Sequence, residues 1–153
     1  MSVSVQSADF DVSAEIGAVR GDRRDIGGIA AFVGTVRDAA GGRPITAMTL
    51  EHFPGMTEAE LERIEAEAQR RWPLLGSRIV HRIGRLLPAD NIVLVVTASA
   101  HRQAAFEAAE FLMDFLKSDA PFWKKEEHAD GTAQWVEAKD KDDQAKARWG
   151  EGA

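Results

Sequence analysis

The sequence contains no cysteine among its 153 residues. The chain therefore has no disulfide framework, no thiolate ligand for a metal ion and no cysteine nucleophile. No apolar run approaches the roughly 20 residues that a membrane-spanning helix requires. The first residues, Met1 to Ser4, show no signal peptide. These absences predict a cytoplasmic protein that does not enter the membrane.

Sequence motifs for metal and nucleotide binding are missing as well. The four histidines are spread along the chain, without the spacing of a metal-ligand set, at His52, His81, His101 and His128. The glycines at 27, 28 and 34 match neither a phosphate loop nor a dinucleotide fingerprint. No G-x-S-x-G elbow is present. We therefore expect no resident metal and no cofactor.

Acidic residues outnumber basic residues, and the formal net charge is −6. General nucleic-acid binding needs a positive surface, so this balance argues against it. A local basic pocket for a small anion is still compatible with the overall charge.

The length and composition indicate one folded domain over residues 1–153. A chain of 153 residues with 44% hydrophobic and 29% charged content can bury a substantial core. Predicted helices and strands interleave, but hairpin-like strand pairs intervene, which favours an α+β fold over a doubly wound sheet. The alternating charges from Lys139 to Ala153 predict a tail that frays.

Hydrophobic periodicity and capping residues predict the individual elements. The strongest strand is Asn91 to Ser99, which is rich in β-branched residues. Ile29 to Val36 is an apolar run that predicts a buried strand, and Ile45 to Glu51 predicts a second strand antiparallel to it. The other expected strands are an edge strand within residues 1–10 and strands at 77–83 and 134–137. A first helix is expected at 14–19 with Ser13 as its cap, and a second begins with the Thr57/Glu60 capping box and has an apolar face of Leu61, Ile64, Ala68 and Trp72. A third helix begins near His101, and its packing face is Ala105, Ala108, Ala109, Leu112 and Leu116.

The stretch from Leu116 to Glu126 contains a sharp change of direction. The last long helix should end at Lys117, because Pro121 cannot continue a helix. Lys117 and Lys124 then flank the corner, where two ammonium groups can face one pocket as nucleophile, acid/base or anion anchors. A structural interpretation is also open, in which Lys117 complements the helix C-terminus and Lys124 is a solvated strand edge.

A second candidate site lies where the strand ending at Ser99 passes into the next helix. Free N–H groups at a helix N-terminus attract anions, and His101 and Arg102 would add a titratable ring and a bidentate guanidinium. Alternatively, His101 only caps the helix and Arg102 is an exposed first-turn cation. Arg37, at the exit of an apolar strand, is either functional or surface, and Phe32 is either core or pocket wall.

Several stretches, taken together in order, resemble the large, catalytic subunit of molybdopterin synthase. They span about residues 28 to 139, and the ordered set is specific although each piece alone is weak. The matching stretches are Phe32 to Arg37, Leu50 to Met56, Arg71 to Pro73, His81 to Gly84, Ser99 to Arg102, Ala120 to Glu126 and Trp135 to Ala138.

The resemblance implies a sulfur transferase with an α/β-hammerhead-type fold. In that family, a homodimer of this subunit binds two small ubiquitin-like sulfur carriers to form a heterotetramer. Each carrier brings a C-terminal Gly-Gly thiocarboxylate, and two sulfurs convert cyclic pyranopterin monophosphate into molybdopterin. A chain without cysteine is consistent with this chemistry, because the carrier supplies the sulfur. The alternative function is a docking module that binds the carrier tail without catalysis.

The resemblance also assigns roles to residues. It implies that Lys117 and Lys124 are the catalytic pair, and that Arg37, His101 and Arg102 hold the pterin and its phosphate. The resemblance also implies that Phe32 and Met113 line that pocket. It implies that Lys139 is a basic residue that reaches a neighbouring subunit's site. Two positions depart from the family pattern: Phe53 stands where tyrosine is common, and Lys139 where arginine is familiar.

Overall fold

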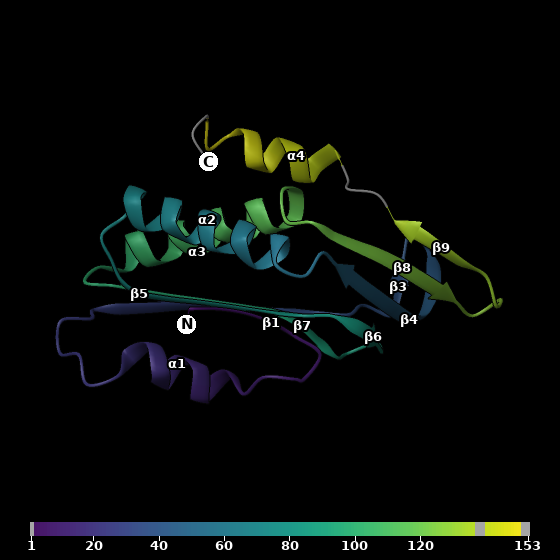
Figure 1. Ribbon diagram of the computed structural model, residues 1–153, viewed down its shortest axis with the longest axis horizontal. Helices are drawn as coiled ribbons and strands as arrows, with labels where there is room; N and C mark the ends of the chain where they lie inside the picture. The colour runs from purple at the N-terminus through teal and green to yellow at the C-terminus, as the bar shows by residue number, and fades with distance from the viewer. Residues whose placement is uncertain (1, 137–139, 151–153) are drawn as a thin grey trace.

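Two β-sheets and four helices make up the chain in a computed structural model that describes residues 2–136 and 140–150 (Figure 1). This arrangement confirms the predicted α+β class. The elements are β1 (Val3–Gln6), α1 (Val12–Arg20), β2 (Gly28–Thr35), β3 (Ala39–Ala40), β4 (Arg43–His52), α2 (Met56–Arg71), β5 (Leu74–Arg82), β6 (Gly84–Leu86), β7 (Asn91–Ser99), α3 (Arg102–Ser118), β8 (Phe122–His128), β9 (Ala133–Val136) and α4 (Asp140–Ala147).

The first sheet has four strands in the order β1-β5-β7-β2. β1 is an edge strand, as predicted, and runs parallel to β5, while β7 is antiparallel to both β5 and β2. β7 is buried from Val93 to Ser99 because it lies inside the sheet and is covered on both faces. The prediction of a buried strand at 29–36 was wrong in its burial: β2 is the opposite edge, and Ala30 is the one residue of β2 that is buried.

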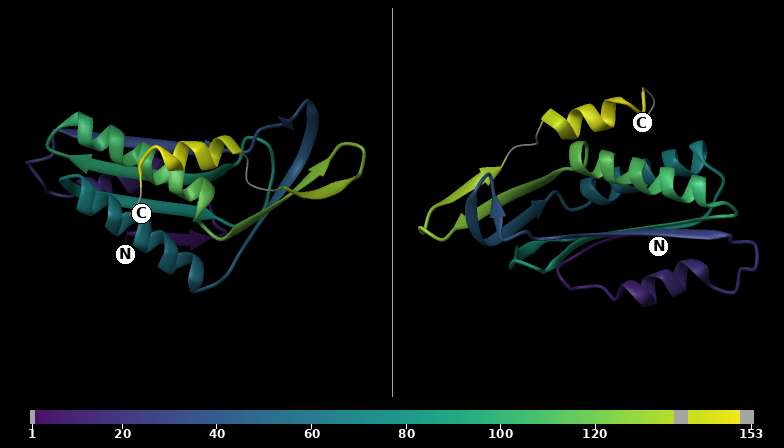
Figure 2. Two further views of the ribbon diagram at one scale, coloured as in Figure 1. Left: turned by 90° about the horizontal axis from the view of Figure 1, so that it is seen from above. Right: turned by 180° about the vertical axis from the view of Figure 1, so that it is seen from behind.

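The helices cover the two faces of this sheet unequally (Figures 1 and 2). α2 and α3 lie on one face, α1 lies on the other, and α4 packs over α3 on the outside. The larger core forms between the sheet and α2 and α3, and includes Leu61, Ile64, Phe111, Leu112 and Phe115. α3 therefore runs along the sheet with its predicted alanine and leucine face buried.

The second sheet has β4 at its centre, paired with β3, β6 and β8. The expectation that residues 45–51 pair with the strand at 29–36 was wrong, because β4 turns away from β2 and enters this second sheet. A tight hairpin joins β3 to β4, and its two glycines, Gly41 and Gly42, both have positive φ, at 57° and 79°. That conformation favours glycine, as the sequence predicted for this loop.

Two helix starts differ from the expected capping residues. α1 begins two residues earlier than predicted, because the Asp11 carboxylate accepts a hydrogen bond from the Ala14 N–H at 3.0 Å in place of Ser13. α2 begins at Met56, with the Glu58 carboxylate accepting from the Gly55 N–H at 3.0 Å. An acidic side chain near a helix N-terminus also interacts favourably with the helix dipole. Both helices therefore begin with a side-chain cap, as predicted, but the capping residues differ from the predicted ones.

The C-terminal segment differs from the expected frayed tail over the part that the structure describes. α4 is followed by Trp149, whose ring packs edge-on against Trp72 and Phe111 at centroid distances of 5.6 Å. The Trp149 indole N–H donates to the Asp114 carboxylate at 2.6 Å. A buried aromatic surface with a satisfied N–H holds this segment on α3, an attachment that the charged tail sequence did not indicate.

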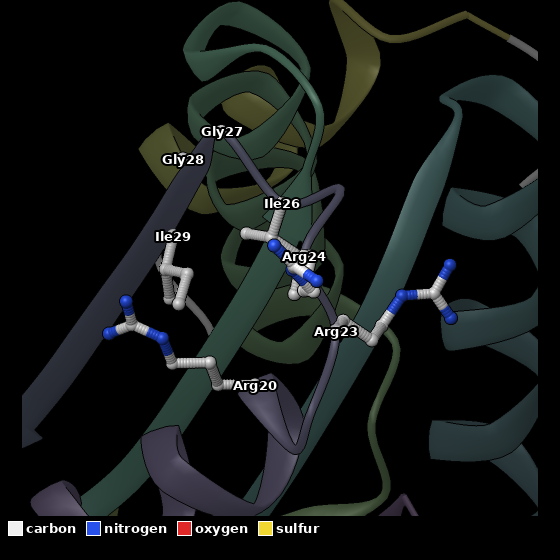
Figure 3. A pocket seen from close by; sticks show the side chains of 7 residues that line it. All are labelled: Arg20, Arg23, Arg24, Ile26, Gly27, Gly28 and Ile29. Atoms are coloured by element: carbon white, nitrogen blue, oxygen red, sulfur yellow. The ribbon is translucent and has the colours of Figure 1, made fainter.

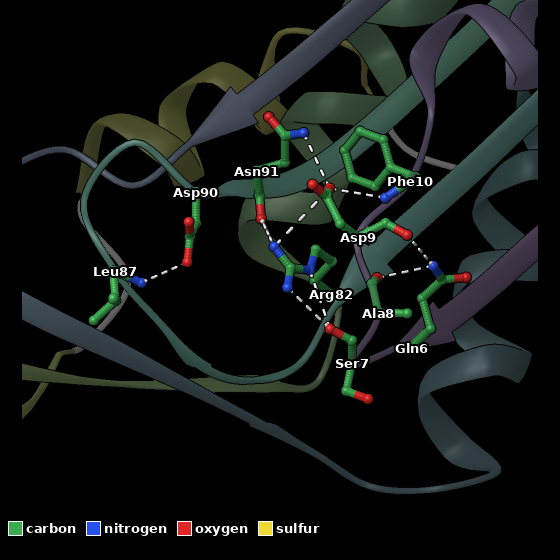
Figure 4. A network of polar contacts seen from close by, with 9 residues as sticks. All are labelled: Gln6, Ser7, Ala8, Asp9, Phe10, Arg82, Leu87, Asp90 and Asn91. Carbon is green, nitrogen blue, oxygen red and sulfur yellow. Dashed lines mark hydrogen bonds and ion pairs between the residues drawn. The ribbon is translucent and has the colours of Figure 1, made fainter.

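A polar network joins the segment after β1 to the ends of β5 and β7 (Figure 4). The Arg82 guanidinium donates to the carbonyl oxygens of Ser7 and Asn91, and the Asn91 amide donates to the Asp9 carboxylate at 3.0 Å. The hydrogen bond from Asn91, and then that from the Phe10 N–H, lowers the pKa of Asp9. These contacts fix the β5 end that carries His81.

Gly27 allows the chain before β2 to approach the start of α3. Its N–H donates to the Ser99 carbonyl at 2.9 Å, and a Cβ at this position would lie 1.9 Å from the Ala100 carbonyl oxygen. We expect Gly27→Ala to lower the free energy of unfolding by about 3 kcal/mol, because the backbone has to shift. Chemical denaturation would measure this loss.

Gly17→Ala is the matched control, since a Cβ there meets nothing within 4 Å and the residue lies inside α1. In a helix interior, alanine is favoured over glycine by about 0.5–1 kcal/mol. Equal stability of the Gly27 variant and the wild type would contradict the close approach.

Candidate functional site

A cavity of about 340 Å³ lies where α3, β2 and the start of β8 meet. Its walls are largely apolar, with Ile92, Val93 and Leu116 among them. Its polar and charged side chains include Arg37, His81, Lys117 and Lys124. Small-molecule sites typically combine such an apolar wall with a few convergent polar groups. This cavity is therefore the candidate site.

The two predicted lysines reach this cavity from the two sides of the Pro121 corner. Lys117 lies in the last turn of α3 and is exposed, whereas Lys124 lies on β8 opposite Leu50 and is half-buried. The corner is tight: the Phe122 N–H donates to the Ala120 carbonyl at 2.8 Å. The structure thus brings both lysines to one cavity, which is the first of the two interpretations of this corner and the one that the resemblance implies.

Lys125 lies on the other side of β8 and does not line this cavity. Successive side chains of a strand point to opposite faces, and the Lys125 ammonium lies 5.8 Å from the centre of the Trp135 ring. β8 pairs with both β4 and β9, so neither lysine lies on a strand edge, and Lys124 faces the candidate site.

Three more of the predicted residues line the same cavity. Phe32 and Arg37 come from β2 and the segment after it, and Met113 comes from α3. Phe32 is 45% exposed, so it is pocket wall and not core. An aromatic side chain at an edge strand is open to the cavity because no further strand covers it.

His81 is a cavity residue that the sequence analysis did not single out. It is 8% exposed, and its ring stacks on Phe122 at a centroid distance of 3.8 Å and an interplanar angle of 16°. Burial, together with the positive charges of Lys124 and Lys117, lowers the pKa of His81 to about 4. One available signal was position: His81 follows the buried Ile79 by two residues, so both side chains face the α2–α3 side of the sheet.

This shift makes stability depend on pH. The folded pKa of His81 lies below its unfolded value of about 6.5, so the unfolded chain binds the proton more tightly. The stabilisation is complete above pH 6.5 and is lost as the pH falls toward 4. We expect about 2–3 kcal/mol of the unfolding free energy to disappear between pH 7.5 and 4.5 through this residue.

Urea unfolding at both pH values, for the wild type and for His81→Asn, would measure this contribution. The carboxylates titrate in both proteins, so the difference between the two pH dependences belongs to His81. His101→Asn is the control, because His101 is exposed. An identical pH dependence in the wild type and His81→Asn would contradict a neutral, buried imidazole.

The structure does not bring His101 and Arg102 to this cavity within one chain. Both are exposed at the N-terminal end of α3, and His101 makes no side-chain capping hydrogen bond. At 1.5 Å per residue, Arg102 and Lys117 lie about 22 Å apart along the helix. The predicted set is therefore divided between the two ends of α3.

The region beside the α3 N-terminus is cationic (Figure 3). Arg20, Arg23 and Arg24 surround a hollow of about 430 Å³ at the segment that leads into β2. Gly28 lies against the Arg102 backbone, since a Cβ on Gly28 would be 3.2 Å from the Arg102 Cα. Arg23 pairs with Asp25 at 2.8 Å. This end of the molecule therefore concentrates arginine in a chain of net negative charge.

Three further observations concern the predicted ligands and location. Lys139 lies outside the described residues. Within residues 2–136 and 140–150, no cluster of three or more histidine, aspartate or glutamate side chains is arranged to hold a metal ion. In the same part of the chain, no helix has the length and apolar character needed to cross a membrane.

Comparison with known proteins gives consistent matches. A family model described as "MoaE protein" matches residues 5–119. The chain is 58% identical over 149 residues to the molybdopterin synthase catalytic subunit of Mesorhizobium japonicum, covering 97% of this chain and 92% of that protein. The solved MoaE protein from Burkholderia ambifaria is 53% identical with a TM-score of 0.84, over 99% of each chain. Molybdopterin synthase from Staphylococcus aureus is 28% identical with a TM-score of 0.81, over 88% of this chain and 96% of that one.

Proposed function

This chain belongs to the MoaE protein family, and on that premise we propose that it is the catalytic subunit of a molybdopterin synthase. It transfers sulfur from the C-terminal thiocarboxylate of a small ubiquitin-like carrier to cyclic pyranopterin monophosphate. Two transfers form the dithiolene of molybdopterin, and the cyclic phosphate opens. The observation that carries this proposal is the meeting of Lys117, Lys124 and Arg37 in one cavity.

The cavity suits an anionic donor and a small heterocyclic substrate. Its volume of about 340 Å³ lies within the usual range of small-molecule sites. The apolar walls lower the local dielectric constant, so ammonium and guanidinium groups interact more strongly with developing negative charge than they would in water. Phe32 and Met113 form part of the wall beside which the pterin ring lies.

The two lysines have separate roles at the carrier tail. Lys117 contacts the thiocarboxylate carbonyl or the carboxylate that leaves after sulfur transfer. Lys124 stabilises the negative charge that develops in the transition state, or moves a proton to it. Arg37 offers a planar guanidinium to the substrate phosphate.

The remaining substrate-binding residues come from a second subunit. His101 and Arg102 lie about 22 Å along α3 from Lys117, which is too far for one small substrate to bridge within a single chain. In a twofold homodimer, the α3 N-terminus of one subunit faces the cavity of the other and supplies both residues. The family resemblance assigns Lys139 to that same shared site. Two carriers complete a heterotetramer, which acts in the cytoplasm.

The experiment that tests this function separates the enzyme from the docking module. Purified chain is mixed with thiocarboxylated carrier and cyclic pyranopterin monophosphate, and carrier binding and pterin products are measured in the same sample. The enzyme gives dithiolene product, and Arg37→Ala reduces the yield without releasing the carrier. A docking module binds the carrier, gives no product, and is insensitive to Arg37→Ala.

A further inference from the structure

The His81 imidazole has a defined environment on nearly every side. Val5 and Val93 flank it in register on the neighbouring strands, and Phe122 stacks on its ring. These neighbours are apolar, so the polar contacts of His81 are carried by its two ring nitrogens alone.

The contact made by Nδ1 sets the tautomer. Nδ1 of His81 lies 2.9 Å from the carbonyl oxygen of Arg82. A carbonyl oxygen can only accept a hydrogen bond, so Nδ1 carries the proton and donates. In the neutral ring, Nε2 is then unprotonated and presents a lone pair. Arg82 is itself held by Ser7 and Asn91, which keeps this carbonyl in place.

The strand geometry places Lys124 beside this ring. Phe122 and Lys124 are two residues apart on β8, so their side chains point to the same face. Phe122 stacks on His81, and Lys124 is the next side chain along that face. His81, Lys117 and Lys124 all line the same cavity. The charged groups that act on the ring are the ammonium groups of Lys124 and Lys117 and, more weakly, the His52 ring.

We propose that His81 is a positioning residue for Lys124: its Nε2 lone pair accepts a hydrogen bond from the Lys124 ammonium once the carrier tail and the pterin fill the cavity. This inference rests on the function proposed above. A neutral acceptor can orient an ammonium without cancelling its charge, whereas a carboxylate would form an ion pair and weaken its attraction for the thiocarboxylate. The remaining Lys124 N–H groups then point at the reacting atoms.

Two amide substitutions separate the two ring nitrogens. The asparagine amide N–H falls near the position of Nδ1, so His81→Asn keeps the contact with the Arg82 carbonyl and removes the Nε2 acceptor. The glutamine amide reaches the position of Nε2, so His81→Gln keeps an acceptor toward Lys124 and loses the Nδ1 donor. A purely structural role predicts that His81→Asn is the milder change.

The test is steady-state sulfur transfer by each variant with thiocarboxylated carrier in excess, across pH 6 to 10, with thermal unfolding to confirm folding. We expect His81→Asn to lower kcat about 10- to 100-fold with little change in KM for the pterin, because misplaced catalytic groups cost about this much. His81→Gln should remain within about fivefold of the wild type. The Nε2 acceptor of His81 stabilises the protonated amine of Lys124. In His81→Asn this acceptor is missing, so the alkaline limb of the pH profile of kcat should move to lower pH.

Other outcomes overturn the inference. A milder defect in His81→Asn than in His81→Gln would assign the residue to holding the Arg82 carbonyl. Equal losses in both variants, or no loss in either, would remove any role for the Nε2 acceptor. Absence of product from the wild type would instead contradict the proposed function, so the two failures are distinguishable.

Discussion

Replacing Lys117 by alanine should reduce sulfur transfer by about 1,000-fold while leaving the protein folded. The expected loss is that of a group which contacts the reacting atoms, typically 100- to 10,000-fold for proton transfer or electrostatic stabilisation. Lys117 is exposed at the end of α3, so its removal leaves no buried cavity and no unsatisfied core group. Single-turnover formation of the dithiolene from thiocarboxylated carrier measures the effect.

Lys125→Ala is the matched control for this variant. Lys125 carries the same charge and lies next to Lys124, but it faces Trp135 and not the cavity. We expect it to retain activity within about threefold of the wild type, because Lys125 does not line the cavity. Near-wild-type turnover by Lys117→Ala, or an equal loss in both variants, would remove Lys117 from the reaction centre.

The second large effect is a recovery of activity in mixed dimers. Lys117→Ala and Arg102→Ala homodimers should each be nearly inactive if one site draws Lys117 from one subunit and Arg102 from its partner. In a dimer that contains one subunit of each kind, both defects fall in one site and the other site is intact. Doubly tagged mixed dimers should therefore show about half of the wild-type activity per dimer.

The control is a mixed dimer of wild type with Lys117→Ala, which should also retain about half of the activity. If Lys117 and Arg102 served the same site within one chain, both sites of the Lys117→Ala/Arg102→Ala dimer would be defective. Such a dimer would show no recovery, and that result would contradict the sharing of α3 between two sites.

Local sequence patterns predicted much of the fold. The strand at Asn91–Ser99, the helix that ends before Pro121 and the buried face of α3 each follow from period, β-branching or a helix breaker. The same local chemistry allowed Lys117 and Lys124 to share a cavity, and the family resemblance assigned both to one site. The residue types at a corner determine the backbone direction over only a few residues. A single sequence therefore predicts such local structure better than it predicts contacts between distant segments.

Long-range pairing was less predictable. β2 is as apolar as an inner strand, yet it is a sheet edge that pairs only with β7 among the described strands. β4 was placed beside β2, but no local pattern records which strands pair across a turn. His81 was missed because its role depends on Phe122 and Lys124, which are more than 40 residues away in sequence.

The separation of His101 and Arg102 from Lys117 has a similar origin. The sequence resemblance groups these residues by function without stating which subunit supplies each of them. The geometry of α3 separates them, because a helix of this length has a fixed rise per residue. The structure therefore shows that Arg102 and Lys117 lie at opposite ends of α3, which the motifs alone do not reveal.

We propose above that this chain moves sulfur from a carrier thiocarboxylate to a pterin. The most direct measurement is a single turnover with carrier whose thiocarboxylate holds a heavy sulfur isotope, followed by mass analysis of the pterin product. We predict that both dithiolene sulfurs carry the isotope, because the chain has no cysteine from which sulfur could be taken. Carrier that binds but yields no labelled pterin would contradict sulfur transfer by this chain.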